Sequence, residues 1–571
     1  MPKNKKTTSL ISIIKIQDLR IVRIKNYIST ISCLALLWLG MNVSSCSMVG
    51  DDSEDAIVEE EGVGDIYIQL NLTTNGKAGT RAGLGADHPY GGEDGDGTEE
   101  GHFHENDINN ITIFIYNDAE GHGINNTEST LIKFKKYFTT LDLQQLTDGS
   151  YETKPLLVHG YKSAENDRII VLVNMGDQTD LGTLTSVRNK LISTAWGISG
   201  TSIQDYYNFA MSSAVDDATY GKVILTNPGT YENPFSAAVK VERLAARIDF
   251  GFDKSLEASS YRGYIEYPVE GITGDKFRLS HIRMVNASQA PTYALKRTAT
   301  TVNPLDGVNY LGDETVVTST HIPNNYVVEP NTTRKKKDAS ITETDLSSWY
   351  GASTLQASLS TSFIAPNTYK VHSTASDAEV FEVCDYGSIK NYCYTLGYAM
   401  ENTMDKSCAD ARVMTALQIK GTYVPAKVYV YVDDETKSYK EESSTPYTAG
   451  TDFWYFDNQT TPANSYPFVS QADLLAYAAK HPSEDYVGRH YVKGECYYYV
   501  WIRHSMYSDP TYKSGSFPME FGIVRNNIYR IYVDKVLKIG PEVPTPELPD
   551  LISSHIHVRD WRLRIHEDIL L

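Results

Sequence analysis

The sequence contains 571 residues, 41% of them hydrophobic, which is enough to fill the cores of two or more domains. Its 40 tyrosines, and short alternating runs rich in Val, Ile and Thr that are separated by Gly, Asn and Asp, favour sheets over helices. The formal charge of −20 argues against nucleic acid as a partner.

The N-terminus has the layout of a secretory signal. Seven Lys and Arg residues precede Ile28, and an apolar run follows that ends at Val43-Ser-Ser-Cys46, which resembles a bacterial lipobox. We therefore expect residues 1–45 to be removed and Cys46 to be lipidated, with palmitate as the lipid; the alternative is a chance Cys after an ordinary signal. Removal takes seven bases and one acid from the totals of 52 and 72, which leaves a formal charge of −26.

The stretch 65–73 is the first predicted strand. Hydrophobic residues occupy every second position, which is the pattern of a half-buried strand. A glycine-rich run follows, and it contains the basic residue Arg81 directly before Ala82, where a protease could cut and release the strand. We interpret this strand as temporary, with its buried face formed by Ile66, Ile68, Leu70 and Leu72.

The next segment, 83–105, is rich in glycine and acidic residues. Asp94 and Asp96 resemble half of a calcium loop, and His102 and His104 could ligate a metal as a pair, but the remaining ligands of either site are missing. A linker is therefore favoured, and we predict no metal site and no cofactor.

Strands and one helix follow quickly. We predict strands at 111–116, 153–161, 168–174 and 238–250, and a surface helix around 184–192. A polar shift after residue 252 closes the predicted first domain.

The predicted second domain contains more strands and longer loops. Residues 300–350 have little periodicity, and the basic cluster 334–337 within them is interpreted as a solvated loop and nicking site. Ser470 is a suitable N-cap for a helix that ends at Lys480. Its predicted apolar stripe is Leu474, Leu475, Ala478 and Ala479, and the predicted strands are 277–286, 361–365, 394–398, 415–423, 427–432, 495–503 and 521–537.

Four cysteines remain after Cys33 leaves with the signal and Cys46 takes lipid: Cys384, Cys393, Cys408 and Cys496. An even number outside the cytoplasm permits two disulfides, whereas free buried thiols are equally compatible with the spacing. Both alternatives stay open.

The C-terminus combines a stiff spacer with another strand. Four prolines within 540–549 favour an extended spacer that is neither helix nor central strand. In the strand beyond it, the hydrophobic parity changes across residues 559–560, as at a bulge. The residues of this predicted strand, which hangs free as a donor for a neighbour, are Ile556, Val558, Trp561, Leu563 and Ile565.

No nucleophile elbow, phosphate loop, dinucleotide fingerprint or metalloprotease motif occurs in the sequence, and its carboxylates are scattered. We therefore predict that the protein is not an enzyme and has no catalytic residues. A strand on a cuttable tether at one end, and a strand beyond a stiff spacer at the other, indicate head-to-tail strand donation.

Six segments together resemble Bacteroidales fimbrillins of the minor-fimbrium major-subunit family, which build type V pili. These segments are Val43-Ser-Ser-Cys46, Gly79-Thr-Arg-Ala82, and residues 107–116, 239–250, 397–402 and 521–529.

The resemblance implies a mainly β chain with two transthyretin-like β-sandwich domains, a few short helices and a C-terminal donor strand. It also implies export as an outer-membrane lipoprotein precursor, cleavage at Arg81-Ala82 by an Arg-specific surface protease, and polymerisation with itself and other fimbrial subunits. The resulting fimbrium would serve adhesion and colonisation by binding host or bacterial surface ligands. The implied parts are a signal peptide at 1–45, a propeptide at 46–81, sandwiches at 82–252 and 253–540, and a spacer with donor strand at 541–571.

Two alternatives remain. The long loop at 300–350 leaves open an accessory or tip subunit. A glycan-binding outer-membrane lipoprotein is the alternative from another class, because exposed aromatic rings stack on sugars.

Overall fold

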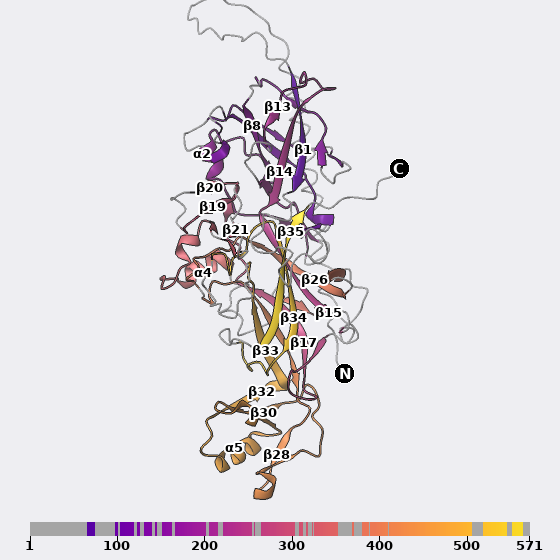
Figure 1. Ribbon diagram of the computed structural model, residues 1–571, viewed down its shortest axis with the longest axis vertical. Helices are drawn as coiled ribbons and strands as arrows, with labels where there is room; N and C mark the ends of the chain where they lie inside the picture. The colour runs from indigo at the N-terminus through magenta and orange to yellow at the C-terminus, as the bar shows by residue number, and fades with distance from the viewer. Residues whose placement is uncertain are drawn as a thin grey trace, which may run out of the picture. The chain divides into compact units, whose positions relative to one another are not determined.

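The computed structural model describes a chain that is mainly β with a few short helices, as predicted (Figure 1). All described residues belong to one compact unit, Val63–Leu571. They are residues 65–74, 98–100, 103–118, 121, 123–125, 131–139, 143–145, 151–162, 166–200, 205–214, 221–253, 256, 264–302, 308–311, 316–317, 322–323, 325–351, 368–370, 380–386, 389–408, 410–504, 518–544 and 551–562.

The first large sheet has ten strands and a continuous apolar core on one face. Strand β1 lies inside this sheet rather than at its edge. The strands, in spatial order, are β4 (Phe134–Phe138), β3 (Ile111–Asn117), β8 (Asp167–Val173), β12 (Met211–Ser213), β14 (Phe235–Arg243), β1 (Ile66–Thr74), β6 (Tyr151–Thr153) and β5 (Leu143–Gln145), with β13 (Val223–Ile224) on β14 and β7 (Leu156–Val158) on β1.

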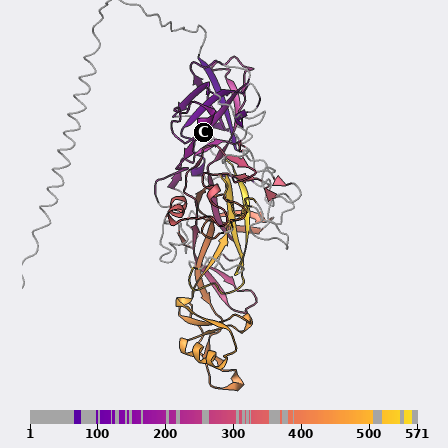
Figure 2. The same ribbon diagram turned by 90° about the vertical axis from the view of Figure 1, so that its left-hand side faces the viewer.

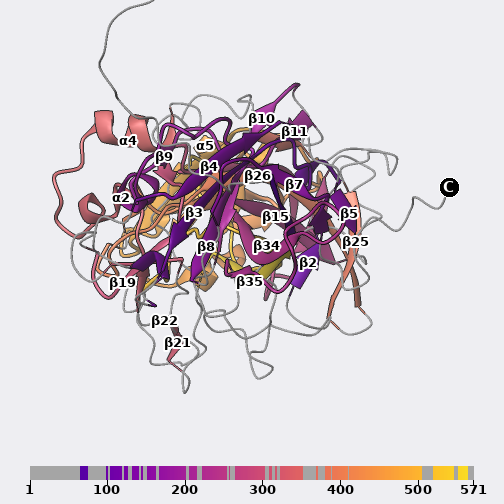
Figure 3. The same cartoon turned by 90° about the horizontal axis from the view of Figure 1, so that it is seen from above.

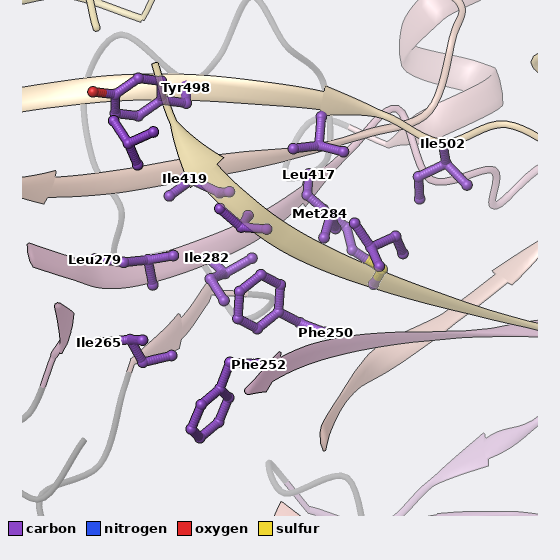
Figure 4. Packing of buried hydrophobic residues seen from close by; sticks show 14 of the residues in the cluster. Phe250, Phe252, Ile265, Leu279, Ile282, Met284, Leu417, Ile419, Tyr498 and Ile502 are labelled. Carbon is purple, nitrogen blue, oxygen red and sulfur yellow. The ribbon is translucent and has the colours of Figure 1, made fainter. Parts of the chain in front are cut away.

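Two further sheets share one core and form a β-sandwich. Figure 4 shows Phe250 and Phe252 of one sheet facing Ile282 and Leu279 of the other. The six-stranded sheet is β2 (Thr98–Glu100), β35 (Ile552–Arg562), β34 (Asn527–Val536), β15 (Ala245–Asp253), β26 (Ile389–Met400) and β25 (Val380–Tyr386); its partner is β16 (Ile265–Pro268), β17 (Lys276–Val285), β27 (Ala416–Val424) and β33 (Glu495–Trp501), with β24 (Thr368–Lys370) on β17.

The predicted single strand 238–250 is wrong, because β14 and β15 lie in different sheets. The buried apolar positions of β14 are odd-numbered, including Val239 and Val241, whereas those of β15 that face the sandwich core are even-numbered, including Ile248 and Phe250. This change of parity was visible in the sequence. The change of sheet comes at Leu244, within the range 82–252 that was predicted for the first domain.

Residues 425–494, here called the inserted module, interrupt a pair of neighbouring strands. Strands β27 and β33 pair directly, from Ala416 with Trp501 to Thr422 with Glu495, and the chain between them forms its own sheet and core. Figures 1 and 2 show helix α5 against this sheet. Its elements are β28 (Tyr429–Tyr431), β29 (Lys440–Glu442), β30 (Phe453–Asn458), β31 (Tyr466–Phe468), α5 (Gln471–Lys480) and β32 (Tyr486–Tyr491).

Helix α5 begins after Ser470, whose hydroxyl accepts a hydrogen bond from the Asp473 amide at 3.1 Å, as predicted. Its buried face differs from the prediction. Leu475 is 52% exposed and Ala479 is also exposed, because Tyr477 occupies the face between Leu474 and Ala478. The sequence did not reveal the module as a unit, because its short strands resemble those around it.

The described part of the stretch 300–350 contains regular structure that its sequence did not suggest. It contains α4 (Glu343–Tyr350), which Thr342 caps, and the 3₁₀ turn η5 (Thr332–Arg334). The predicted solvated basic cluster is wrong at Lys335, which is fully buried. The other short elements are α2 (Leu184–Arg188), η1 (Phe103–Glu105), η2 (Gly123–Asn125), η7 (Glu435–Lys437), η8 (Pro462–Asn464), η9 (Val492–Gly494), β9 (Leu191–Ile192), β10 (Gly197–Ile198), β11 (Tyr206–Tyr207), β18 (Thr292–Tyr293), β19 (Arg297–Ala299), β20 (Asn309–Tyr310), β21 (Val316–Val317), β22 (Ile322–Pro323) and β23 (Tyr326–Val327).

The described cysteine side chains decide part of the disulfide question. Cys393, Cys408 and Cys496 are buried and form no disulfide with one another. Burial raises the pKa of the Cys408 thiol to about 11 and that of Cys496 to about 12, so both thiols are unreactive at neutral pH. The side chain of Cys384 lies outside the described residues.

Glu242 on β14 makes the stability of the protein depend on pH. Burial raises the pKa of its carboxyl group from 4.5 to about 7, although Lys296 at 3.2 Å and Arg525 lower it. The folded state therefore binds a proton that the unfolded state releases as pH rises above 4.5, and the stabilisation from this group is lost between pH 4.5 and about 7.

We expect this loss to reach about 3 kcal/mol of the free energy of unfolding. Urea unfolding of the wild type and of Glu242→Gln across this pH range measures it, because the variant lacks the titrating group. If the difference between the two proteins is the same at every pH, the Glu242 carboxyl does not titrate in this range.

Candidate functional site: the two terminal strands

Strand β1 is a central strand of the first sheet (Figure 1). It pairs in parallel with β14 from Ile68 with Phe235 to Thr74 with Val241, and antiparallel with β6 and β7 on its other side. The predicted alternation is present: Ile68, Leu70 and Leu72 are fully buried, and the half-buried Ile66 packs against the same core.

Several further contacts hold β1 in place. The Tyr67 amide donates to the Gly229 carbonyl at 2.8 Å, and the Leu70 amide donates to the Thr153 hydroxyl at 3.0 Å. At the start of the strand, Asp65 lies 2.7 Å from the His159 ring. Burial of the three aliphatic side chains contributes about 5–9 kcal/mol, which is comparable with the net stability of a domain.

Loss of β1 would leave two strand edges unpaired inside the sheet. The edge of β14 and the facing edges of β6 and β7 would then expose backbone donors, acceptors and the apolar core between them. Such a gap accepts an extended strand with alternating apolar side chains. The geometry therefore fits replacement of one strand by another.

The predicted lipidation site, Cys46, and the predicted cleavage site, Arg81-Ala82, lie outside the described residues. So do the candidate metal ligands Asp94, Asp96 and His102. Among the described residues, no group of three or more His, Cys, Asp or Glu side chains is placed to hold a metal ion. No helix in the part of the chain that is described is long and apolar enough to cross a membrane.

The chain after the tether is fixed by buried charges, here called the junction cluster: Glu105, Arg247, Asp249, Tyr398 and Arg530. All five side chains are buried. Arg247 donates to Glu105 at 3.1 Å and to Asp249 at 3.0 Å, and the Tyr398 hydroxyl donates to Glu105 at 2.5 Å. Two strands of the six-stranded sheet, β15 and β26, thus hold η1 independently of β1, and Arg530 of β34 lies 3.7 Å from Asp249 in the same cluster.

Within the junction cluster, burial and the Glu105 carboxylate raise the pKa of Tyr398 well above its usual value. The Tyr398 hydroxyl is therefore neutral and can donate to Glu105. His104 lies 3.1 Å from the same hydroxyl, so its ring is engaged here rather than in a metal site among the described residues.

Strand β35 contains three of the five predicted donor residues, Ile556, Val558 and Trp561. We predicted that this strand hangs free. In the structure it pairs antiparallel with β34 of the same chain, from Ile552 with Val536 to Asp560 with Asn527. Ile556 is 4% exposed and contributes to the core of the sandwich. This pairing was not expected from the sequence; without β35, the edge of β34 would be unpaired, so it offers a place for the strand within its own chain. The donor role itself stays a prediction.

The predicted bulge at residues 559–560 is also wrong. The register is continuous there, and the irregularity lies on β34 between Val533 and Lys535. Figure 3 shows β34 between β15 and β35. The short strand β2, which follows the tether, pairs with the end of β35. Leu563 and Ile565 lie outside the described residues.

Comparison with known proteins gives one family match. Residues 489–567 match the family model of the major fimbrial subunit protein type IV, fimbrillin, C-terminal. The match includes β33, β34 and β35. No curated protein matches the chain.

Solved structures with some likeness include a fimbrilin from Porphyromonas gingivalis W83, 14% identical, with a TM-score of 0.35 over 88% of this chain and 98% of that one. A putative cell adhesion protein from Parabacteroides distasonis is 13% identical, with a TM-score of 0.35 over 87% and 100% of the two chains. The tip fimbrial protein Mfa3 from Porphyromonas gingivalis, with a C-terminal truncation, is 10% identical, with a TM-score of 0.30 over 87% and 100%.

TM-scores of 0.30–0.35 do not establish a shared fold. The link to known proteins is therefore the family match at the C-terminus. It lies where β34 and β35 pair and includes the strand pair that closes the sandwich. The resemblance to fimbrillins found in the sequence is thus confirmed for residues 489–567, which match the fimbrillin C-terminal model.

Proposed function

We propose that this chain is a structural subunit of a cell-surface fimbria that polymerises by strand exchange. The carrying observation is that β1 is a central, fully paired strand joined to the rest of the chain by the glycine-rich tether. A released β1 leaves a gap that only another strand can fill. The match to the fimbrillin C-terminal region supports the fimbrial role.

In this proposal, the chain reaches the outer membrane as a lipoprotein anchored at Cys46. An Arg-specific surface protease cuts between Arg81 and Ala82, and β1 departs with the propeptide. The junction cluster supports this order of events, because it holds the chain from His104 onward without any contribution from β1.

The incoming strand is β35 of a neighbouring subunit. It has to leave β34 and the short strand β2 of its own chain first, so donation exchanges these pairings for a central position beside β14. A central position pairs both edges of the donor and buries its apolar face, which favours the exchange. Because the contact is head-to-tail, the product is a filament rather than a closed ring.

Arg81→Ala tests the trigger, and Lys77→Ala in the same tether is the matched control. The first variant should accumulate as a lipidated monomer with β1 in place, whereas the control should be cut and assemble normally, because the protease is specific for arginine. N-terminal sequencing and SDS-resistant ladders are the measurements. Ladders from the uncut Arg81→Ala protein would exclude cleavage there as the trigger.

Truncation after Gly540 tests the donor. The truncated subunit should still be cut but should not extend filaments, and a peptide covering residues 551–571 should fill its open gap and restore resistance to proteolysis. Ile556→Asp in the peptide is the control. Filaments of normal length from the truncated protein alone would exclude β35 as the donor.

Glycan binding is the second candidate, and the inserted module favours it. The half-buried Trp454 ring stacks on the His490 ring at 4.4 Å and 6° on the inserted sheet. Flat aromatic faces of this kind bind sugar rings. Trp454→Ala should abolish binding to a glycan array while filaments still form; unchanged glycan binding would remove this candidate.

A further inference from the structure

Three polar side chains meet in a closed site beneath α4. The Lys335 ammonium nitrogen Nζ lies 2.8 Å from Glu329 Oε1 and 2.7 Å from Asn402 Oδ1. Lys335 and Asn402 are fully buried, and Glu329 is 2% exposed. The Lys335 amine is therefore in direct contact with both a carboxyl group and a carboxamide, away from water.

The orientation of the Asn402 amide is fixed by its other partners. Its Nδ2 donates to the Val413 carbonyl at 2.9 Å and to the Thr415 hydroxyl at 2.8 Å. A carbonyl oxygen can only accept, so the amide nitrogen must point toward Val413. The amide oxygen consequently faces Lys335, and the electrophilic carbon Cγ is one bond beyond it.

The hydroxyl group of Tyr350 and the rings of Trp349 and Tyr350 complete the site. The Tyr350 hydroxyl lies 3.2 Å from Asn402 Oδ1, where it can donate to negative charge developing on that oxygen. The rings of Trp349 and Tyr350 lie 5.2 and 5.5 Å from the Lys335 nitrogen. These apolar surfaces exclude water from the amine.

The low polarity of the site favours neutral groups. Burial raises the pKa of the Glu329 carboxyl group, although Lys335 acts in the opposite direction. Transfer of one proton from the Lys335 ammonium to the Glu329 carboxylate removes both charges and leaves a neutral amine. A neutral amine is a nucleophile, whereas an ammonium is not.

We propose that Lys335 and Asn402 join in an intramolecular isopeptide bond, with Glu329 as the acid–base catalyst. Glu329 takes a proton from the Lys335 ammonium, and the free amine attacks Asn402 Cγ. The bond from Nζ to Cγ forms, the bond from Cγ to Nδ2 breaks, and Nδ2 takes up the proton that Nζ loses as it becomes the amide nitrogen. One ammonia leaves, the surplus proton leaves with it as ammonium, and no oxidant or further reactant is needed.

The bond would connect two distant parts of the chain. Lys335 directly follows η5, and Asn402 follows β26 and pairs with Ile523 of the fimbrillin-like C-terminal region. The closed ring of chain would run from 335 to 402 and contain α4. A protease cut within this range would leave both fragments covalently joined, which suits a protein outside the cell.

The alternative is a buried ion pair with a hydrogen-bonded amide and no covalent bond. Mass spectrometry separates the two directly on the full chain. The proposal predicts that the measured mass is lower than the mass calculated from the sequence by one ammonia. In a peptide map, the peptides that contain Lys335 and Asn402 should be found as one branched peptide. Recovery of the two peptides separately, with unmodified masses, overturns the proposal.

Two variants and one control assign the chemistry. Lys335→Arg keeps a cation beside Glu329 but has no nucleophilic amine, and Glu329→Gln keeps a hydrogen-bonding group but cannot take the proton. Both should lose the branched peptide completely, whereas Lys336→Arg, at the exposed neighbouring position, should retain it. Circular dichroism checks that each variant is folded. A branched peptide that persists in folded Glu329→Gln overturns the catalytic role of Glu329, and one that persists in Lys335→Arg overturns the linkage.

Discussion

Replacing Leu70 with Ala is expected to destabilise the uncut precursor by about 2–5 kcal/mol. The side chain is fully buried in the core of the first sheet, where the surrounding strands cannot collapse around the space it leaves. Urea unfolding of the Arg81→Ala precursor, which keeps β1 attached, measures the loss.

The same substitution should have no effect on the assembled filament, because β1 has left it under the proposed function. Gln69→Ala is the matched control: it lies on the same strand, half-buried on the opposite face, and should change the precursor by less than about 1 kcal/mol. If Leu70→Ala weakens mature filaments as much as the precursor, β1 stays in the filament and strand exchange at this position is excluded.

Local patterns in the sequence predicted β1 well, because a strand with one buried face has a period of two. Ile68, Leu70 and Leu72 needed no tertiary information. The start of helix α5 could also be predicted from the sequence, since its Ser470 cap is a local feature. The buried face of α5 could not be predicted in the same way, because it depends on packing against the inserted sheet. There Tyr477 is buried and Ala479 is exposed.

The fate of β35 could not be predicted from its own residues. Its alternation is compatible with any unpaired strand edge, whether in the same chain or in a neighbour, and the sequence does not rank these partners. The pairing with β34 depends on where that edge lies after folding. Under the proposed function, the donor strand and the strand paired with β34 are the same segment, so its release would be a step in assembly.

The buried charges were missed for a different reason. A Lys within a basic run, such as Lys335, has the same sequence context whether it is solvated or buried, and only the fold brings Glu329 and Asn402 to it. Arg247 and Asp249 offered a weak signal, because they alternate with apolar residues on a strand with few polar positions. Charged residues on such a strand indicate a buried ionic cluster.

Arg247→Met is expected to lower the free energy of unfolding by about 3–5 kcal/mol. The substitution removes the Arg247 guanidinium from the buried carboxylates of Glu105 and Asp249, which lie 3.1 and 3.0 Å from it. Arg530, at 3.7 Å from Asp249, is more distant. Limited proteolysis near residue 103 should also increase, because Arg247 helps to hold η1 in place. Urea unfolding at neutral pH measures the first effect.

Arg278→Met is the control, since its ion pair with Glu266 at 2.9 Å is partly exposed on the same sandwich. Such a pair should contribute only about 0–1 kcal/mol. Adding Glu105→Gln to Arg247→Met should recover part of the loss, because the buried negative charge that Arg247 had paired with is then removed. Equal losses for Arg247→Met and Arg278→Met, with no recovery in the double variant, would mean that the junction cluster does not fix the chain after the tether.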